Sequence, residues 1–243
     1  MSKKKFRMFA GPNGSGKSTL IEEISKKFNI GYFINADRIE SELNTKKHFD
    51  CSLLFPQPIS PEEWRDFLLE KSSDKRITEK SFMGLQIREN FFTATHVIDS
   101  YQASVIAEFF REKLIHSDMT FSFETVMSHE SKVMFLEKAK DLGFTTYLYF
   151  ICTRDPKINI QRVKNRVLEG GHHVEENKIT SRYFRSLDLL CKAFLVVDRA
   201  FIIDSSHKTN EVIMEKQQND IIIHKDEVPG WIDEYLLRKL KLT

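Results

Sequence analysis

The segment Gly11-Pro12-Asn13-Gly14-Ser15-Gly16-Lys17-Ser18-Thr19 has the residue types and spacing of a phosphate-binding loop, G-x-x-x-x-G-K-[ST]. Glycines let such a loop curl so that successive backbone N–H groups point at phosphate oxygens. Lys17 would reach the β- and γ-phosphates, and the Ser18 hydroxyl would ligate Mg²⁺. The nucleotide-binding residues that we predict are Gly11, Asn13, Gly14, Ser15, Gly16, Lys17, Ser18 and Thr19.

The residues on either side of this loop place it between a strand and a helix. Residues 6–10 are a mainly apolar run that predicts a strand, and residues 20–24 continue as an amphipathic helix. The N-terminus of that helix would add its dipole to the same anion site. The pattern therefore predicts a protein that binds ATP or GTP together with Mg²⁺.

Composition limits the classes of protein to consider. The chain has 243 residues, enough for one large domain with an insertion, and its apolar fraction of 41% supports a proper core. A formal net charge of +2 is nearly balanced, so we expect no nucleic-acid partner. The cysteines lack C-x-x-C spacing, which argues against a zinc site or a disulfide framework. No apolar run approaches the ~18 residues of a membrane span, so we expect a cytoplasmic protein with no membrane partner.

The order of strand-like and helix-like segments predicts an α/β fold. We expect one P-loop kinase-like domain over residues 1–243, with three α/β/α layers and a mainly parallel sheet. Expected strands are residues 6–10, 31–35, 119–123, 145–152 and 200–203, with a hairpin at 213–224. Expected helices are residues 37–43, 97–116, 131–142, 156–168, 176–192 and 231–240.

Residues 45–95 interrupt this alternation. Prolines cluster in the first part of the segment and residues 71–80 are polar, so we expect a helical or irregular insertion. The Phe-rich stretch 82–92 is interpreted as exposed, which would make the insertion a surface for a partner.

Polar residues that follow the predicted strands are the candidates for chemistry, because ligands bind at the carboxyl ends of parallel strands. Asp37 could accept the proton of an acceptor hydroxyl as a general base or help to order Mg²⁺, or it could be a helix N-cap. The phosphate loop one strand away favours a role in the chemistry over the cap. Glu124 and Thr125 could order Mg²⁺ or bind the acceptor, or Glu124 could be the N-terminal charge of the next helix.

A group of arginines follows the strand at 145–152. Arg162 and Arg166 lie four residues apart and share a helix face, and arginine forks stabilise the charge of a phosphoryl group in transfer. Gly170-Gly171 then breaks the helix and Arg182 lies beyond it, so residues 166–185 predict a mobile lid over the phosphates. The alternative is that these arginines face solvent, with Glu169 as a partner.

Taken in order, these motifs resemble the zeta toxin family of P-loop kinases, and in particular its small bacterial zeta-like members described as predicted ABC-type ATPases. Two features depart from the family pattern: Ser205 replaces an expected asparagine, and residues 45–95 have no counterpart. The shared segments are 11–19 (GPNGSGKST), 33–37 (FINAD), 121–125 (FSFET), 162–167 (RVKNRV), 170–172 (GGH), 182–187 (RYFRSL) and 203–206 (IDSS).

The resemblance implies transfer of the γ-phosphoryl group of ATP or GTP to a hydroxyl of a small molecule. Zeta toxins phosphorylate UDP-N-acetylglucosamine. By this resemblance Asp37 is the catalytic base, acting with Lys17. Glu124 and Thr125 contact the acceptor, and Arg162 and Arg166 lie in the phosphate-facing region.

Arg182, in the shared segment RYFRSL, is a further candidate for substrate binding. Two other functions fit the phosphate loop. The protein could be a P-loop ATPase that couples hydrolysis to conformational change or partner binding, or a nucleotide-dependent binding module. No residue of the sequence indicates an antitoxin-like partner.

Overall fold

The protein consists of two compact units. The computed structural model describes residues 3–52, 54–55, 57–171 and 173–242. The first unit is formed by Met1–Gly31 with Thr120–Thr243, and the second by Tyr32–Met119. The second unit therefore contains the whole predicted insertion, 45–95, and residues on both sides of it. That residues 1–243 form a single domain stays a prediction.

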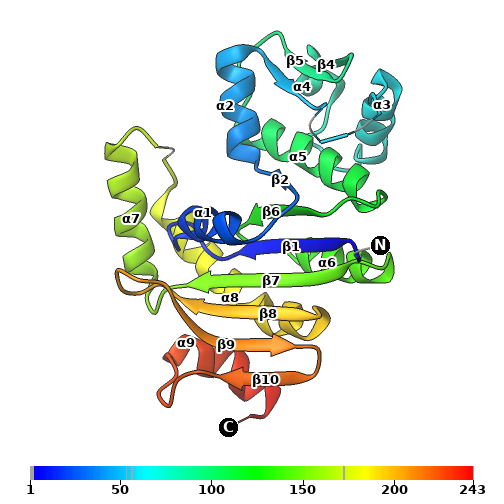
Figure 1. The fold of residues 1–243 in the computed structure, drawn as a ribbon. Coiled ribbons are helices and arrows are strands. Elements are labelled where there is room, and N and C mark those ends of the chain that lie inside the picture. The colour runs from blue at the N-terminus through cyan, green and yellow to red at the C-terminus, as the bar shows by residue number, and fades with distance from the viewer. Residues whose placement is uncertain (1–2, 53, 56, 172, 243) are drawn as a thin grey trace. The chain divides into compact units, whose positions relative to one another are not determined.

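The first unit is built on a mainly parallel sheet in which its strands follow the order β10-β9-β8-β7-β1-β6 (Figure 1). β1 pairs in parallel with both β6 and β7, and β7 pairs in parallel with β8. β9 and β10 continue the sheet as antiparallel strands. The strands are β1 (Lys5–Ala10), β6 (Phe121–Thr125), β7 (Thr145–Cys152), β8 (Arg199–Asp204), β9 (Glu211–Gln217) and β10 (Asp220–Ile223).

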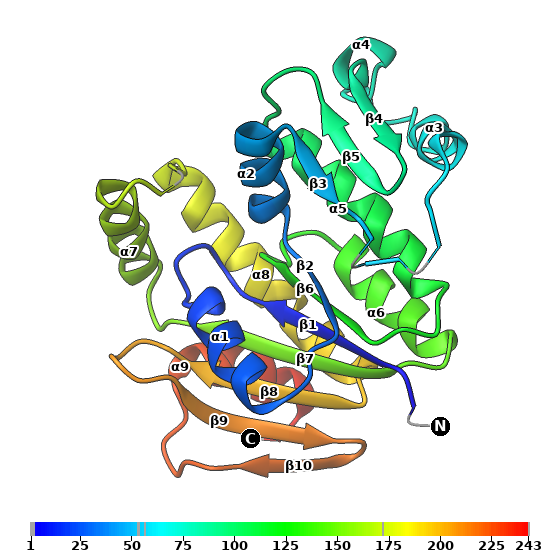
Figure 2. The same ribbon diagram turned by 45° about the horizontal axis from the view of Figure 1, so that its top comes forward.

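Helices cover both faces of this sheet, so its central strands β1 and β7 are almost entirely buried. Helix α1 lies on one face, and α6 and α8 lie on the other (Figures 1 and 2). The predicted α/β class with a mainly parallel sheet is confirmed. The helical segments are α1 (Lys17–Lys27), α6 (Ser131–Asp141), α7 (Pro156–Leu168), α8 (Glu176–Val196), α9 (Gly230–Ile232), the π-helical η1 (Asp233–Leu237) and α10 (Arg238–Leu240).

The second unit contains a small antiparallel sheet that the sequence did not predict, with the strand order β3-β5-β4. Helices α2 and α5 pack against each other beside it. The elements are β2 (Tyr32–Ile34), α2 (Ala36–Lys46), β3 (His48–Asp50), α3 (Pro61–Glu70), α4 (Glu79–Phe82), β4 (Leu85–Arg88), β5 (Phe91–Ala94) and α5 (Ser100–Ile115).

The core of the second unit is aromatic. The ring of Trp64 lies 4.9 Å from that of Phe92 and 5.2 Å from that of Phe109, both at steep angles. Phe82 and Phe92 are buried, so the expectation that residues 82–92 form an exposed Phe-rich surface is wrong. Successive side chains of a strand point to opposite faces, so on β5 Phe91 is exposed while Phe92 is buried in the core.

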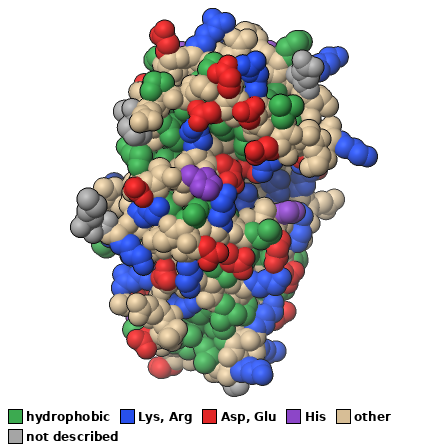
Figure 3. All heavy atoms as spheres, turned by 90° about the vertical axis from the view of Figure 1, so that its right-hand side faces the viewer, with side chains coloured by type: hydrophobic (Ala, Val, Ile, Leu, Met, Phe, Trp, Pro, Cys, Tyr) green, Lys and Arg blue, Asp and Glu red, His purple; other side chains and the backbone are tan. Residues whose placement is uncertain are grey.

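The surface shows no strong separation of charge on the face that Figure 3 presents, where acidic and basic side chains are interspersed. None of the described helices combines the length and the apolar character that a membrane crossing requires.

Candidate functional site

The loop from Gly11 to Thr19 joins the carboxyl end of β1 to the start of α1. It leaves the sheet between β6 and β7, and the Gly11 N–H donates to the Thr125 carbonyl at 3.3 Å. Gly11, Gly14 and Gly16 all have positive φ angles, of 145°, 73° and 90°.

Glycine is required at two of these positions because the backbone of other elements comes very close. A Cβ on Gly11 would lie 2.0 Å from the Ile151 carbonyl oxygen of β7. A Cβ on Gly14 would lie 2.5 Å from the Asn159 carbonyl oxygen of α7. At Gly16, the N-cap of α1, no side chain caps the helix. The first N–H groups of α1 are therefore not bonded by a capping side chain and suit an anion.

Lys17 is buried at the first position of α1, and its ammonium group is held at the loop. Its Nζ donates to the carbonyls of Gly11 and Pro12, each at 2.9 Å. The Oε1 atom of Glu124 lies 3.7 Å from the same Nζ. The structure thus brings together the predicted lysine and the acid at the end of β6. Glu124 stands within β6, far from the start of α6, so its alternative role as a helix N-terminal charge is wrong.

Ser18 and Thr19 follow Lys17 in the first turn of α1, and both are exposed. Thr125 stands beside Glu124 at the end of β6, and its Oγ1 accepts the Met127 N–H at 3.1 Å. These hydroxyl-bearing residues therefore lie on the edge of the first unit where β1 and β6 end.

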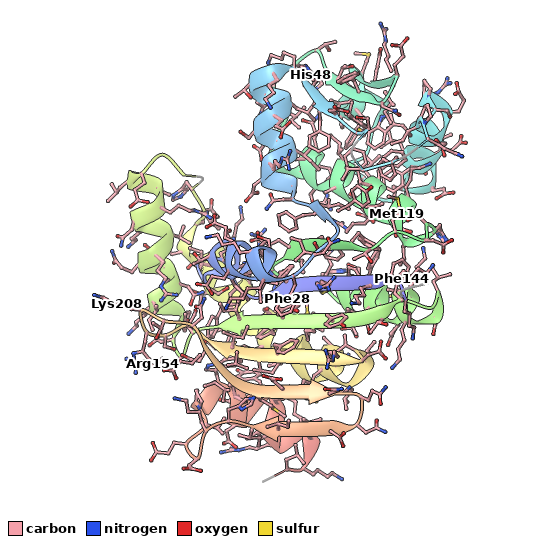
Figure 4. All side chains as sticks on the ribbon, in the orientation of Figure 1. Phe28, His48, Met119, Phe144, Arg154 and Lys208 are labelled. Atoms are coloured by element: carbon pink, nitrogen blue, oxygen red, sulfur yellow. The ribbon has the colours of Figure 1, made fainter. Side chains whose placement is uncertain are left out.

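The same edge carries the loops that follow β7 and β8. Figure 4 shows Arg154 and Lys208 on this side of the sheet, whereas Phe144 marks the opposite end of β7. The Arg154 N–H donates to Ser206 Oγ at 2.8 Å, which ties the two loops together. Asp204, the last residue of β8, accepts the Trp231 Nε1–H at 2.8 Å and so links this edge to α9.

The three predicted arginines occupy different places in the first unit. Arg162 donates through Nη2 to the carbonyls of Ser205 at 2.6 Å and His207 at 3.2 Å. Arg182 Nη1 lies 3.5 Å from Asn13 Oδ1, at the phosphate loop itself. Arg166 is exposed near the end of α7. A phosphate contact for any of them stays a prediction.

The predicted lid, residues 166–185, includes the last residues of α7 and the first half of α8. His172 within this range lies outside the described residues. A pocket of about 420 Å³ opens between these helices, with walls that are mainly apolar and include Val163, Leu168 and Ile179. On its rim Lys164 pairs with Glu176 at 2.7 Å. Phosphate needs converging donors, so the loop rather than this pocket stays the predicted nucleotide site.

Asp37 belongs to the second unit and lies in the first turn of α2. The N-cap of this helix is Asn35, whose side chain accepts the Arg38 N–H at 2.9 Å. The alternative role of Asp37 as the cap is therefore wrong. Its role as a catalytic base stays a prediction.

Sequence reasoning missed the role of the polar residues that support the loop from outside, and it noted Ser205 only as a departure from the family pattern. Asn159 of α7 is fully buried and Ser205 nearly so, and both donate to carbonyls of the phosphate loop. A signal for Asn159 exists in the sequence, since it lies four residues before Val163 in the predicted helix 156–168 and so shares a face with an apolar residue.

Comparison with known proteins gives one short sequence match. No family model matches the chain. An uncharacterized protein of Haemophilus influenzae is 33% identical over 69 residues, which are 28% of this chain and 49% of that protein. The chain thus matches about half the length of this relative.

Solved structures show the fold more completely. The native AvrRxo1-ORF1:-ORF2 complex gives a TM-score of 0.62 at 12% identity, covering 98% of this chain and 66% of that one. AvrRxo1-ORF1:-ORF2 with ATP gives 0.58 at 11% identity, covering 91% and 61%. The PezAT chromosomal toxin–antitoxin system of Streptococcus pneumoniae gives 0.51 at 15% identity, covering 84% and 69%. At these identities the likeness shows the fold alone, an α/β fold with a mainly parallel sheet.

Proposed function

We propose that this protein is an ATP- or GTP-dependent phosphotransferase of the zeta-toxin type, which passes the γ-phosphoryl group to a hydroxyl of a small molecule. The observation that carries the proposal is the position of Lys17, buried in a glycine loop with the Glu124 carboxylate 3.7 Å from its ammonium group. The fold shared with AvrRxo1, which has been crystallised with ATP, supports the same conclusion.

The loop would bind the triphosphate through backbone N–H groups and the N-terminus of α1, where a developing negative charge is stabilised. Lys17 would exchange its contacts with the Gly11 and Pro12 carbonyls for phosphate oxygens. In a site that excludes water, such a charge acts more strongly than it does in solution.

A magnesium ion fits the residues present. No group of three or more potential acidic, histidine or cysteine ligands occurs among the described residues. Mg²⁺ bound through substrate phosphates and few protein atoms does not need one. The exposed Ser18 hydroxyl at the start of α1 would hold it, and the ion would supply charge neutralisation to the β- and γ-phosphates.

Asp37 would take the proton of the acceptor hydroxyl as that oxygen forms a bond to the γ-phosphorus. The bond between this phosphorus and the bridging oxygen breaks at the same time, and the nucleoside diphosphate leaves. Glu124 and Thr125 would orient the acceptor. We propose UDP-N-acetylglucosamine as the first acceptor to test, on the basis of the resemblance to zeta toxins.

The test is transfer from γ-labelled ATP to UDP-N-acetylglucosamine with mass detection of the product. We expect Asp37→Asn to lower transfer by about 100-fold or more while nucleotide binding stays close to wild type. Lys17→Ala should abolish turnover and also weaken nucleotide binding. Asp66→Asn, an exposed carboxylate of the same unit as Asp37, is the matched control. Transfer at the wild-type rate by Asp37→Asn would show that another group is the base.

Hydrolysis of ATP without any phosphorylated acceptor would favour a P-loop ATPase instead. A protein partner is also part of the proposal, because PezAT, whose structure has a similar fold, is a toxin–antitoxin system. An increase in the rate of phosphoryl transfer after a co-purified protein is removed would support an antitoxin-like partner.

A further inference from the structure

Two carbonyl groups of the phosphate loop are held by side chains from outside the loop. Asn159 Nδ2 donates to the Asn13 carbonyl at 2.7 Å, and Ser205 Oγ donates to the Ser15 carbonyl at 2.6 Å. Asn159 is 0% exposed and Ser205 is 2% exposed. Both hydrogen bonds are therefore shielded from competition with water, which makes them expensive to leave unmade.

The orientation of Asn159 is fixed by its own neighbours. The Asn13 carbonyl can only accept a hydrogen bond, so the amide nitrogen of Asn159 is the end that faces it, and the Asn159 Oδ1 accepts the Thr153 hydroxyl. The Tyr183 hydroxyl in turn donates to the Thr153 carbonyl at 2.6 Å. Burial raises the pKa of Tyr183, so this hydroxyl keeps its proton. The result is a chain of bonds from α8 to the loop.

Arg162 fixes Ser205 in a similar way. Its Nη1 donates to Ser205 Oγ at 3.3 Å and its Nη2 to the Ser205 carbonyl at 2.6 Å. Since the serine oxygen already accepts from the guanidinium group, its single proton is directed to a carbonyl, and the Ser15 carbonyl is the nearest at 2.6 Å.

The planarity of the peptide bond converts these contacts into an orientation of the loop. In a trans peptide, the carbonyl and the following N–H point to opposite sides of the chain. A Ser15 carbonyl held toward Ser205 turns the Gly16 N–H away from it, and an Asn13 carbonyl held toward Asn159 does the same for Gly14.

We propose that Asn159 and Ser205, the latter with Arg162 behind it, are positioning residues that orient the Gly14 and Gly16 amides toward phosphate. This inference rests on the nucleotide site of the proposed function. It assigns to Arg162 a support of the loop, in place of the phosphate contact that the sequence predicts.

The two roles of Arg162 have different consequences for binding. A side chain that contacts the γ-phosphate would discriminate between ATP and ADP, and its loss would weaken ATP binding selectively. A side chain that orients loop amides acts on whichever phosphates the loop holds, so its loss weakens ATP and ADP binding by similar factors.

The experiment is calorimetric titration of the full chain with ATP and, separately, with ADP, in the absence of an acceptor. We expect Ser205→Ala to weaken both by about fivefold, the effect of one lost neutral hydrogen bond. Asn159→Asp keeps the shape but removes the donor, and should weaken both at least as much. Ser205→Thr keeps the hydroxyl, so it should bind ATP and ADP more tightly than Ser205→Ala does and close to wild type. Arg199→Ala, at the opposite end of β8, is the control for loss of a positive charge.

A double-mutant cycle tests whether Arg162 acts through Ser205. We expect Arg162→Ala to weaken ATP and ADP alike, and the added Ser205→Ala change to have little further effect. Additive losses, or a loss confined to ATP, would overturn the assignment of Arg162. Variants that fold, as judged by thermal unfolding, and bind both nucleotides as wild type does would overturn the support of the loop while leaving the proposed function intact. A wild-type protein that binds neither nucleotide would overturn both.

Discussion

Cys51 is buried in the second unit, and loss of solvation raises the pKa of its thiol from 9.0 to about 12. Burial also raises the pKa values of Cys152 and Cys191 in the first unit. A protonated thiol is a poor nucleophile and a poor metal ligand. At the scale of single residues, the cysteines therefore contribute to packing and not to the chemistry of the site.

A pH dependence of stability follows from Cys51. Its folded pKa exceeds its unfolded pKa, so its contribution to stability is complete below about pH 9 and is lost as the pH rises toward 12. In this window the thiol loses its proton when the protein unfolds, so the free energy of unfolding falls by up to about 1.4 kcal/mol for each unit that the pH rises. Urea unfolding between pH 8 and 11 should show a steeper decline for wild type than for Cys51→Ala. Equal slopes would mean that the thiol ionises normally.

At the scale of elements, the sequence predicted the first unit better than the second. The run at 145–152 matches β7 because a central parallel strand is apolar throughout, which is a local signal. β4 is four residues long and its alternation of buried and exposed side chains is too brief to recognise. β3 and β4 each form by hydrogen bonding to β5. Pairing between strands leaves no pattern in the sequence of any one of them.

The same limit applies to the candidate site. Lys17 and Glu124 were predicted from a motif and from the end of a strand, both of which are local. The bond from Asn159 to Asn13 spans 146 residues, and that from Ser205 to Ser15 spans 190. Residues this far apart become partners only through the strand order, so a single sequence does not reveal them.

The phosphate loop is the element in which glycine substitutions should be most informative. Gly14 has a φ angle of 73°, and a Cβ there would collide with the α7 backbone, 2.5 Å away. We expect Gly14→Ala to abolish measurable nucleotide binding while thermal stability falls only modestly. Gly143→Ala is the matched control, because Gly143 has a φ angle of 84° but open space around it. Nucleotide binding by Gly14→Ala at wild-type affinity would contradict this account.

At the scale of the whole molecule, each unit has an aromatic core of its own. Phe6 contacts Phe121 and Phe135 in the first unit, at ring distances of 4.8 and 5.4 Å. Trp64 and Phe92 occupy the equivalent place in the second unit. Separate cores predict that a unit can loosen without loss of protection in the other.

Hydrogen exchange on two tryptophan variants tests this independence. Trp64→Ala removes the centre of the second core, a change that typically lowers the free energy of unfolding by about 3–5 kcal/mol. We expect faster exchange across residues 32–119 and unchanged exchange in β1, β6 and β7. Trp231→Phe removes the donor to Asp204 and should have the converse effect. Uniform acceleration over the whole chain in both variants would show that the units unfold together.

The central position of β1 also matters for how the protein is made. The ribosome synthesises β1 and the phosphate loop long before β6 and β7, the strands that pair with β1 on either side. Ser205 reaches the loop later still, and the Trp231 bond that anchors Asp204 comes after that. A nascent chain thus carries its complete nucleotide motif before the residues that shape it have been made. Competence to bind nucleotide should arise only after Ser205 and Trp231 have been made, so that shorter nascent chains would not bind nucleotide.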